Sequence, residues 1–160
     1  LLSALDKLVD TNLIFTKPNA DTGGRIIITM IDEYVEKNRE RAISFTSMGQ
    51  VRYLSALKHV DAVVGNSSSG LTEAPTFKIG TINIGDRQKG RIKAKSIIDC
   101  LPQKEAILES IKILYSTRFQ NILSETENLY GDGGASKKIK WVLKTKSLKG
   151  LLKKKFYDLS

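Results

Sequence analysis

Short apolar runs separated by stretches of helical periodicity organise this chain. The runs at 13–16, 42–45, 62–64 and 81–84 predict strands, and residues 96–98 are a candidate for a fifth. These runs lack the alternation of apolar and polar residues that is typical of a half-exposed strand. Uninterrupted apolar strands of this length indicate a parallel sheet that helices cover on both faces.

The segments between the runs predict helices. Residues 104–115 place a row of apolar side chains on one face, as an amphipathic helix requires: Ile107, Leu108, Ile111 and Leu114. Further helices are expected over 3–10, 25–38, 50–59, 71–77, 118–123 and 136–143. Strands that alternate with helices along one chain predict an α/β fold with a Rossmann-like, doubly wound parallel sheet.

Composition and cysteine content limit the class of protein. With 160 residues, of which 41% are hydrophobic and 27% charged, the chain is expected to form one domain with its own core. No apolar stretch approaches the roughly 20 residues that span a bilayer. The single cysteine, Cys100, permits neither an internal disulfide nor a cysteine metal cluster, so a reducing, cytoplasmic setting is expected. His59, the one histidine, is interpreted as a helix-end residue rather than a metal ligand or catalytic group.

The net charge of +9 is concentrated in one segment. Nine lysines and no acidic residue lie between Lys137 and Lys155, whereas the chain before them is close to neutral. A basic tail raises binding to nucleic acid or to an anionic membrane as a hypothesis. The tail has few aromatic residues and no nucleic-acid motif, so a solvated helix face with a basic end is the simpler interpretation.

A polar loop after the third strand is the strongest candidate for a ligand site. It runs Gly65-Asn66-Ser67-Ser68-Ser69-Gly70. In an open α/β sheet, ligands bind beyond the carboxyl ends of the strands, where backbone N–H groups and hydroxyls can hold a phosphate. The alternative is that residues 66–69 cap the next helix, and spacing alone leaves both interpretations open.

Two further groups lie near that loop in the predicted topology. Glu73, in the first turn of the expected helix, would either bind the two hydroxyls of a ribose or complement the helix dipole. The loop Gly85-Asp86-Arg87-Gln88-Lys89-Gly90-Arg91 follows the fourth strand. Arg87 would grip a phosphate or carboxylate through its planar guanidinium, or the loop is simply exposed and polar. The turn at residues 18–25 lies at the same edge of the sheet and would face the same ligand, unless it serves only as a turn.

The chain resembles the hydrolysing UDP-N-acetylglucosamine 2-epimerases of bacteria, both the sialic-acid type and relatives that act on UDP-diacetylbacillosamine. Three segments carry the resemblance: PNADTGGR, VVGNSSSGLTEAPTFKIGTINIGDRQKGR and YGDGGASKKI. The resemblance covers about residues 12–143. It implies the C-terminal half of a glycosyltransferase-B-like architecture, with a UDP-binding Rossmann-like domain over 1–143 and a basic tail over 144–160. A separate N-terminal domain would complete the active-site cleft.

The resemblance also implies how the UDP part of the substrate is held. Ser67 and Ser68 would bind the diphosphate, and Glu73 the ribose hydroxyls. Main-chain groups around Met48, after the second strand, would contact the uracil.

Asn19 and Arg87 are likewise placed in the nucleotide-sugar site. The implied reaction is epimerisation at C2 of the sugar with elimination of UDP, followed by addition of water to give free N-acetylmannosamine or its diacetamido analogue. The acid–base carboxylates of the family belong to the N-terminal domain. No catalytic residue, metal site or cofactor is therefore expected in this chain.

Interpretations from three classes of protein stay open. The chain is either the UDP-binding half of a hydrolysing epimerase, the donor half of a glycosyltransferase, or a basic module for nucleic acid or membrane. The GDRQKGR loop favours the first over the second, and the near-neutral body argues against a nucleic-acid or membrane partner. The apolar residues Trp141 and Leu151-Leu152 leave a homo-oligomer open.

Overall fold

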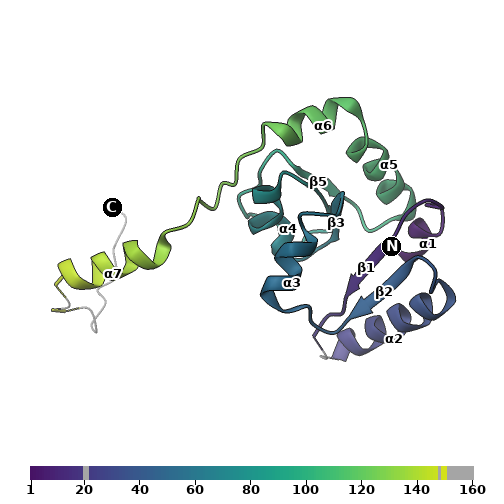
Figure 1. Cartoon of the computed structure of the whole chain (residues 1–160), viewed down its shortest axis with the longest axis horizontal. Helices are drawn as coiled ribbons and strands as arrows, with labels where there is room; N and C mark the ends of the chain where they lie inside the picture. Colours follow the sequence, from purple (N-terminus) through teal and green to yellow (C-terminus); the bar gives the residue numbers. More distant parts are fainter. Residues whose placement is uncertain (20–21, 148, 151–160) are drawn as a thin grey trace, which may run out of the picture. The chain divides into compact units, whose positions relative to one another are not determined.

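In the computed structural model, helices and strands alternate along the chain as the sequence predicts (Figure 1). The structure describes residues 1–19, 22–147 and 149–150. In chain order the elements are α1 (Leu2–Leu5), β1 (Leu13–Thr16), α2 (Thr22–Lys37), β2 (Ala42–Phe45), α3 (Gly49–Ala56), β3 (Ala62–Gly65), α4 (Ser69–Thr72), the 3₁₀ helix η1 (Ala74–Phe77), β4 (Gly80–Ile84), β5 (Ile97–Cys100), α5 (Lys104–Leu114), α6 (Thr117–Ser124) and α7 (Ala135–Thr145).

The described strands form two parallel ladders. In one, β1 pairs with β2; in the other, β4 lies between β3 and β5. Every pairing is parallel, with Leu13 opposite Ala42 and Thr81 opposite Ile97. Helices join these parallel strands except between β4 and β5, where residues 85–96 form a loop, and the arrangement confirms the predicted α/β class.

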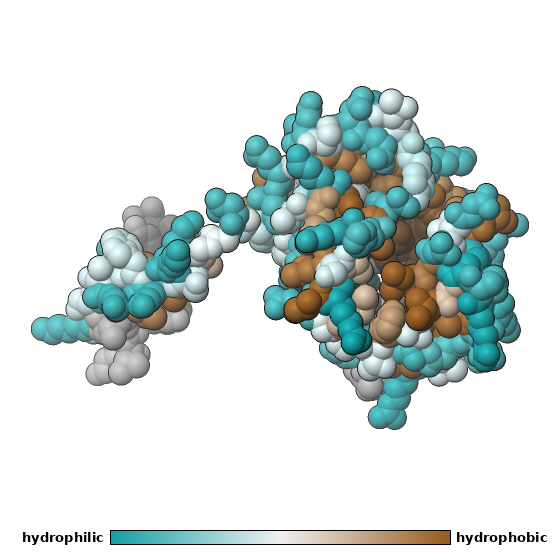
Figure 2. Space-filling view, in the orientation of Figure 1, coloured by the Kyte–Doolittle hydropathy of each residue, from teal (hydrophilic) through white to brown (hydrophobic). Residues whose placement is uncertain are grey.

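The expectation that helices cover each strand on both faces is right only for β4. Its residues 80–83 are all buried, whereas β1 alternates between half-buried and exposed positions. Ile14 and its register partner Ile43 are 46% and 50% exposed. The covered face of this ladder packs on α1 and α2. On the surface of the body of the molecule, apolar residues gather around a hollow (Figure 2).

The helix predicted over 71–77 is wrong in its details. It begins earlier, as the single turn α4, and continues after Glu73 as η1. Pro75 lacks an amide hydrogen, so it cannot donate the bond that would extend α4 into a longer helix. Asn128 fixes this region from a distance, because its Nδ2 donates to the Thr72 carbonyl at 2.9 Å and to Thr76 Oγ1 at 2.6 Å.

Two apolar clusters form the core, and α1 contributes to both. Ala4 is fully buried in the cluster that joins β4 to α5 and α6, which includes Ile82 and Leu114. The next residue, Leu5, is buried in the second cluster, with Tyr34 and Ala42. The helix α1 therefore packs against elements of both ladders.

Arg41 anchors α1 from its carboxyl end. Its Nη1 donates to the Leu8 carbonyl at 2.5 Å, and its Nη2 donates to Tyr34 Oη at 2.8 Å. The turn that follows α1 is therefore attached to the residue that precedes β2. This arrangement supports the packing of α1 with polar contacts at its exposed end.

The chain divides into two compact units, Leu1–Tyr130 and Gly131–Ser160. The sequence placed the start of the tail at residue 144, inside the second unit. In that unit α7 has no buried residue, and its apolar side chains are exposed: Ile139, Trp141, Val142 and Leu143. Leu151 and Leu152 lie outside the described residues. Across the described ranges, none of the helices is both long and apolar enough to cross a membrane.

Replacing Gly80 with alanine is predicted to destabilise the fold. A Cβ at this position would lie 2.2 Å from Leu114 Cδ1 and 3.1 Å from Phe119 Cε1, both on buried side chains. Overpacking of this kind costs about 1–3 kcal/mol, which urea unfolding would measure. Gly23→Ala is the control, because its Cβ would meet no atom within 4 Å and would favour the helix α2. Equal stability of Gly80→Ala and the unmodified chain would contradict the tight packing of β4.

Candidate functional site

The loop from β3 to α4 is exposed and carries the serines predicted to bind phosphate. Gly65 ends β3 with φ +147°, a conformation that side-chain-bearing residues rarely adopt, and the chain turns there. Ser67 Oγ accepts a hydrogen bond from the Ser69 amide at 3.3 Å. Ser68 occupies the N-cap position of α4, but in the described structure its side chain makes no capping bond. Simple helix capping therefore accounts for Ser68 poorly.

The helix α4 contributes little to anion binding through its dipole. It has only four residues, so few peptide dipoles add up along its axis. An anion at this loop would be held mainly by hydroxyl groups, by amide N–H groups and by a nearby cation.

Arg87 supplies that cation from the loop that follows β4. Its Nη1 donates to Asn66 Oδ1 at 3.4 Å, so the guanidinium lies beside the residue that precedes Ser67. Gly85 begins the loop with φ +77°. The fold thus brings together Arg87 and the serine loop, which are about twenty positions apart in the sequence.

Gln88 makes a second, shorter connection between the same loops. Its Nε2 donates to the Asn66 carbonyl at 2.7 Å. The sequence interpretation missed this residue, because within the GDRQKGR segment it considered a binding role only for Arg87. A single uncharged amide between charged neighbours was the only available signal, and it is a weak one.

Glu73 lies at the junction of α4 and η1. It is the C-cap of the first and the N-cap of the second, it is half-buried, and it makes no side-chain capping bond among the described residues. A carboxylate at the carboxyl end of α4 does not complement that helix's dipole. Glu73 is thus not in the first turn of α4, where the dipole interpretation placed it. As the N-cap of η1 it still lies at a helix start, where a carboxylate is favourable, so that interpretation stays open.

Tyr53, on α3, contacts the serine loop, and the sequence interpretation missed it. Its hydroxyl forms a hydrogen bond with Ser69 Oγ. Burial raises the pKa of the Tyr53 phenol, the bond to Ser69 opposes that change, and the charge of Glu73 raises the pKa further.

Asn19 and Met48 follow the two strands of the other ladder. Asn19 is exposed, three residues beyond the end of β1. Met48 is half-buried at the N-cap of α3, and Gly49 next to it has φ +63°. The hydrogen bonds of the described residues join neither side chain to Ser67 or Arg87. Met48 nevertheless precedes the helix that carries Tyr53, which does reach the serine loop.

His59 and Cys100 show no arrangement for metal binding. His59 is exposed in the turn beyond α3, and Cys100 is a free cysteine at the end of β5. Within residues 1–19, 22–147 and 149–150, no group of three His, Cys, Asp or Glu side chains comes together as a metal site would require.

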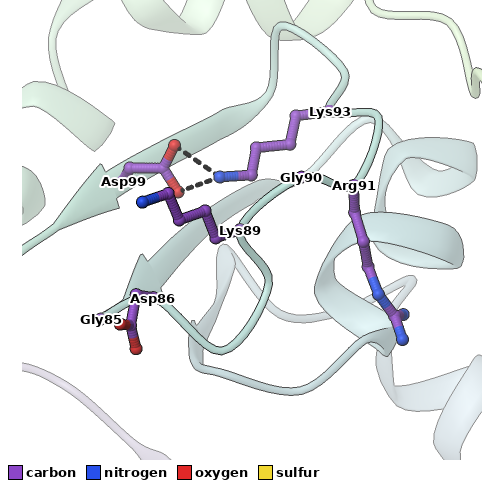
Figure 3. A pocket seen from close by; sticks show the side chains of 7 residues that line it. All are labelled: Gly85, Asp86, Lys89, Gly90, Arg91, Lys93 and Asp99. Atoms are coloured by element: carbon purple, nitrogen blue, oxygen red, sulfur yellow. Dashed lines mark hydrogen bonds and ion pairs between the residues drawn. The ribbon is translucent and has the colours of Figure 1, made fainter.

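An open pocket of about 330 Å³ is lined by residues of the loop that follows β4 and by Asp99 of β5 (Figure 3). Lys93 points at Asp99 there, and its Nζ is 2.8 Å from both carboxylate oxygens, while Arg91 points away from the pair. The buried Asn83 donates from Nδ2 to Asp99 Oδ1 at 2.6 Å. Partial burial acts to raise the pKa of Asp99, but the bonds from Lys93 and Asn83 and the Lys93 charge hold it below its ordinary value.

Comparison with known proteins gives a consistent result. The family model described as UDP-N-acetylglucosamine 2-epimerase matches residues 1–144. A hydrolysing GDP/UDP-N,N'-diacetylbacillosamine 2-epimerase of Campylobacter jejuni is 42% identical over 99% of this chain and 41% of its own length. Polysialic acid biosynthesis protein P7 of Escherichia coli is 39% identical over 81% of this chain and 33% of its own length. The chain therefore spans about two fifths or less of these curated relatives.

A solved structure supports the fold. A Listeria monocytogenes protein assigned as a UDP-N-acetylglucosamine 2-epimerase superposes with a TM-score of 0.66. The superposition covers 90% of this chain and 39% of the other, at 19% sequence identity. At that identity the likeness concerns architecture, and it agrees with an α/β fold of the glycosyltransferase-B type.

Removing the ammonium of Lys93 is predicted to weaken the fold near neutral pH but not in strong acid. Because the folded state lowers the pKa of Asp99, the stability gained is fully present above the unfolded pKa of about 4 and is lost as the pH falls through the folded pKa. Both partners are partly exposed, so Lys93→Met should cost less than about 1 kcal/mol. Urea unfolding across the acid range would measure the difference.

Lys95→Met is the matched control, since Lys95 is an exposed lysine of the same loop and the described ion pairs do not include it. If Lys93→Met lowers the free energy of unfolding by the same amount at neutral pH and in strong acid, the destabilisation comes from lost packing rather than from the lost charge.

Proposed function

This chain belongs to the UDP-N-acetylglucosamine 2-epimerase family, and on that premise we propose that it binds the UDP moiety of a nucleotide-sugar substrate. The observation that carries the proposal is the contact of Arg87 with Asn66, which sets a cation beside the loop of Ser67 and Ser68. A diphosphate presents several anionic oxygens within a few ångströms. A guanidinium fork together with two neighbouring hydroxyls matches that pattern of acceptors.

We propose that Glu73 binds the ribose of the same nucleotide. A carboxylate has two acceptor oxygens, so it can take one hydrogen bond from each of two neighbouring hydroxyls. Glu73 is only five or six positions beyond Ser68 and Ser67 in the chain. Ribose at Glu73 and diphosphate at the serines is thus consistent with the order of groups in UDP.

The uracil is proposed to lie beyond the ribose, against the main chain at Met48. The turn there begins with the αR conformation of Met48 and continues through the positive φ of Gly49. A main chain bent in this way can present carbonyl and N–H groups to a base edge. Asn19, at the end of the neighbouring strand, is proposed to contact the nucleotide sugar from the opposite side.

The whole protein is proposed to be a hydrolysing epimerase. A base would remove the proton at C2 of the sugar while the bond between C1 and the diphosphate oxygen breaks, so that UDP leaves. Water would then add, its hydroxyl to C1 and its proton to C2 on the opposite face. In this scheme Ser67, Ser68 and Arg87 stabilise the departing diphosphate.

The acid and base are proposed to come from the part of the protein that this chain does not contain. General acid–base catalysis needs a titratable side chain within hydrogen-bond reach of the reacting atom. The groups proposed to hold the diphosphate are hydroxyls, amides and a guanidinium, which do not serve as a base at C2. The names of two relatives include UDP-N,N'-diacetylbacillosamine and UDP-N-acetylglucosamine as the sugar donors. The sugar released here is proposed to be the C2 epimer of one of them, N-acetylmannosamine or its diacetamido analogue.

We predict that the chain binds UDP and that Glu73→Ala weakens this binding by about tenfold or more, because hydrogen bonds to charged groups contribute about 1.5–3 kcal/mol. Isothermal titration would measure both affinities. The unmodified chain should bind 2′-deoxyuridine diphosphate less tightly than UDP. Glu73→Ala should bind the two ligands almost equally, since it has lost the group that distinguishes them.

Glu105→Ala is the matched control for Glu73→Ala. Glu105 is an exposed glutamate in the first turn of α5. Its replacement removes one negative charge at a helix end, as Glu73→Ala does, but on an element away from the proposed binding loops. No binding of UDP at millimolar concentration by the unmodified chain would reject the proposal. Salt-dependent binding to a nucleic-acid duplex, lost on removal of residues 144–160, would favour the basic-module alternative.

A second prediction is that the 160-residue chain alone does not turn over substrate. Incubation with UDP-N-acetylglucosamine should release no UDP above the rate of a no-protein sample, as followed by anion-exchange chromatography. The physical reason is that the groups proposed to hold the diphosphate include no base that could remove the proton at C2. Catalytic release of UDP by this chain would show that the acid–base groups lie within it.

A further inference from the structure

We propose that Gln88 is a positioning residue that fixes the Arg87 loop against the serine loop, so that both sides of the diphosphate site are in place before the ligand arrives. The inference rests on the proposed function and adds to it a residue that does not itself touch the ligand. The amide of Gln88 would affect diphosphate binding indirectly, by fixing the positions of Arg87, Ser67 and Ser68.

The geometry of Gln88 differs from that of its neighbours. Its side chain is 3% exposed, whereas those of Asp86, Arg87, Lys89 and Arg91 are exposed. From this buried position Nε2 donates to the Asn66 carbonyl at 2.7 Å, across 22 positions of sequence. One end of the contact is adjacent to Arg87 and the other is adjacent to Ser67. The contact therefore sets the spacing between the two groups that are proposed to face each other across a diphosphate.

The second contact between these loops is too weak to set that spacing by itself. Arg87 Nη1 lies 3.4 Å from Asn66 Oδ1, and both side chains are exposed. Water competes for an exposed bond of that length, and a bound diphosphate would compete for the same guanidinium. The bond from Gln88 is shorter and comes from a buried side chain, so water competes for it less.

The other half of the Gln88 amide argues that stability alone does not explain this residue. Its Oε1 is buried and has no hydrogen-bond partner among the described residues. An unpaired buried acceptor destabilises the folded state, so an apolar side chain of similar size would pack here with little loss. A donor aimed at the Asn66 carbonyl is what glutamine supplies and an apolar residue does not.

Such a bond would act by preorganisation. A binding site whose groups already have the right spacing loses less conformational freedom when the ligand binds. Without the bond, the Arg87 loop would be ordered only on binding, and the affinity for the diphosphate would fall. Contacts to the nucleoside are on other elements, so the affinity for uridine would stay the same.

The test compares UDP with uridine in the unmodified chain, in Gln88→Met and in Gln120→Met. Methionine keeps the length and volume of glutamine but has no amide donor. Gln120 is the matched control, because its Nε2 also donates to a backbone carbonyl at 2.7 Å, that of Leu114, away from both loops. Titrations followed by ¹H–¹⁵N NMR spectra report each affinity and also show whether the variant is folded.

The inference predicts that Gln88→Met lowers the affinity for UDP by about tenfold, the equivalent of about 1.4 kcal/mol and so of one hydrogen bond, and leaves the affinity for uridine unchanged. Gln120→Met should change neither affinity. Gln88→Leu, which also lacks the donor, should behave like Gln88→Met and replaces it if the methionine variant does not fold.

Three results would overturn the inference. If Gln88→Met binds UDP as the unmodified chain does, Gln88 has no positioning role and the proposed function stands. If Gln88→Met binds UDP and uridine more weakly by the same factor, Gln88 contributes only to the packing of the domain and not to the diphosphate site. If the unmodified chain fails to bind UDP, the proposed function and this inference fail together.

Discussion

The packing of α1 between the two strand ladders is the constraint on which the rest of the structure depends. The ladders are not paired through backbone hydrogen bonds, so side chains must hold one against the other. Ala4 and Leu5 are neighbours in sequence but are buried in different clusters. Arg41 donates a hydrogen bond to the Leu8 carbonyl in the turn that follows α1. The proposed nucleotide site needs this connection, because Met48 belongs to one ladder and Ser67 to the other.

Polar contacts then refine the arrangement at the carboxyl ends of the strands. The Tyr53–Ser69 bond joins a helix of the first ladder to the serine loop, and the bond from Gln88 joins that loop to the Arg87 loop. Each contact uses a side chain that is partly or fully withdrawn from water, where hydrogen bonds are less exposed to competition. The site is thus held by a chain of contacts that runs from α3 through the serine loop to the loop after β4.

The sequence predicts the elements well because their signals are local. Strand runs such as 13–16 and 42–45 appear at those residues in the structure. The pairing into separate ladders was not predictable, since it depends on contacts between distant residues rather than on periodicity. For the same reason the exposed partners Ile14 and Ile43 were expected to be covered.

In the candidate site, too, local features were predictable and contacts between distant residues were not. The local pattern, a glycine-terminated strand followed by serines, predicts either a phosphate loop or a capped helix. The roles of Glu73 and Arg87 that the resemblance implies stay predictions. The burial of Gln88 and the position of Tyr53 depend on how loops meet in space, and no spacing rule contains that information. Glu73 was placed in the wrong part of a helix because the effect of Pro75 on its neighbours was not taken into account.

The attachment of Asn128 to α4 and η1 has a consequence for the order in which the chain folds during synthesis. The bond to the Thr72 carbonyl spans 56 positions, whereas the bond from Gln88 to Asn66 spans 22. Chains emerge from the ribosome at about 5–20 residues per second, and contacts close only when both partners are outside. The two loops can therefore meet several seconds before Asn128 is available. The turn that carries Glu73 would be the last part of this site to acquire its final support.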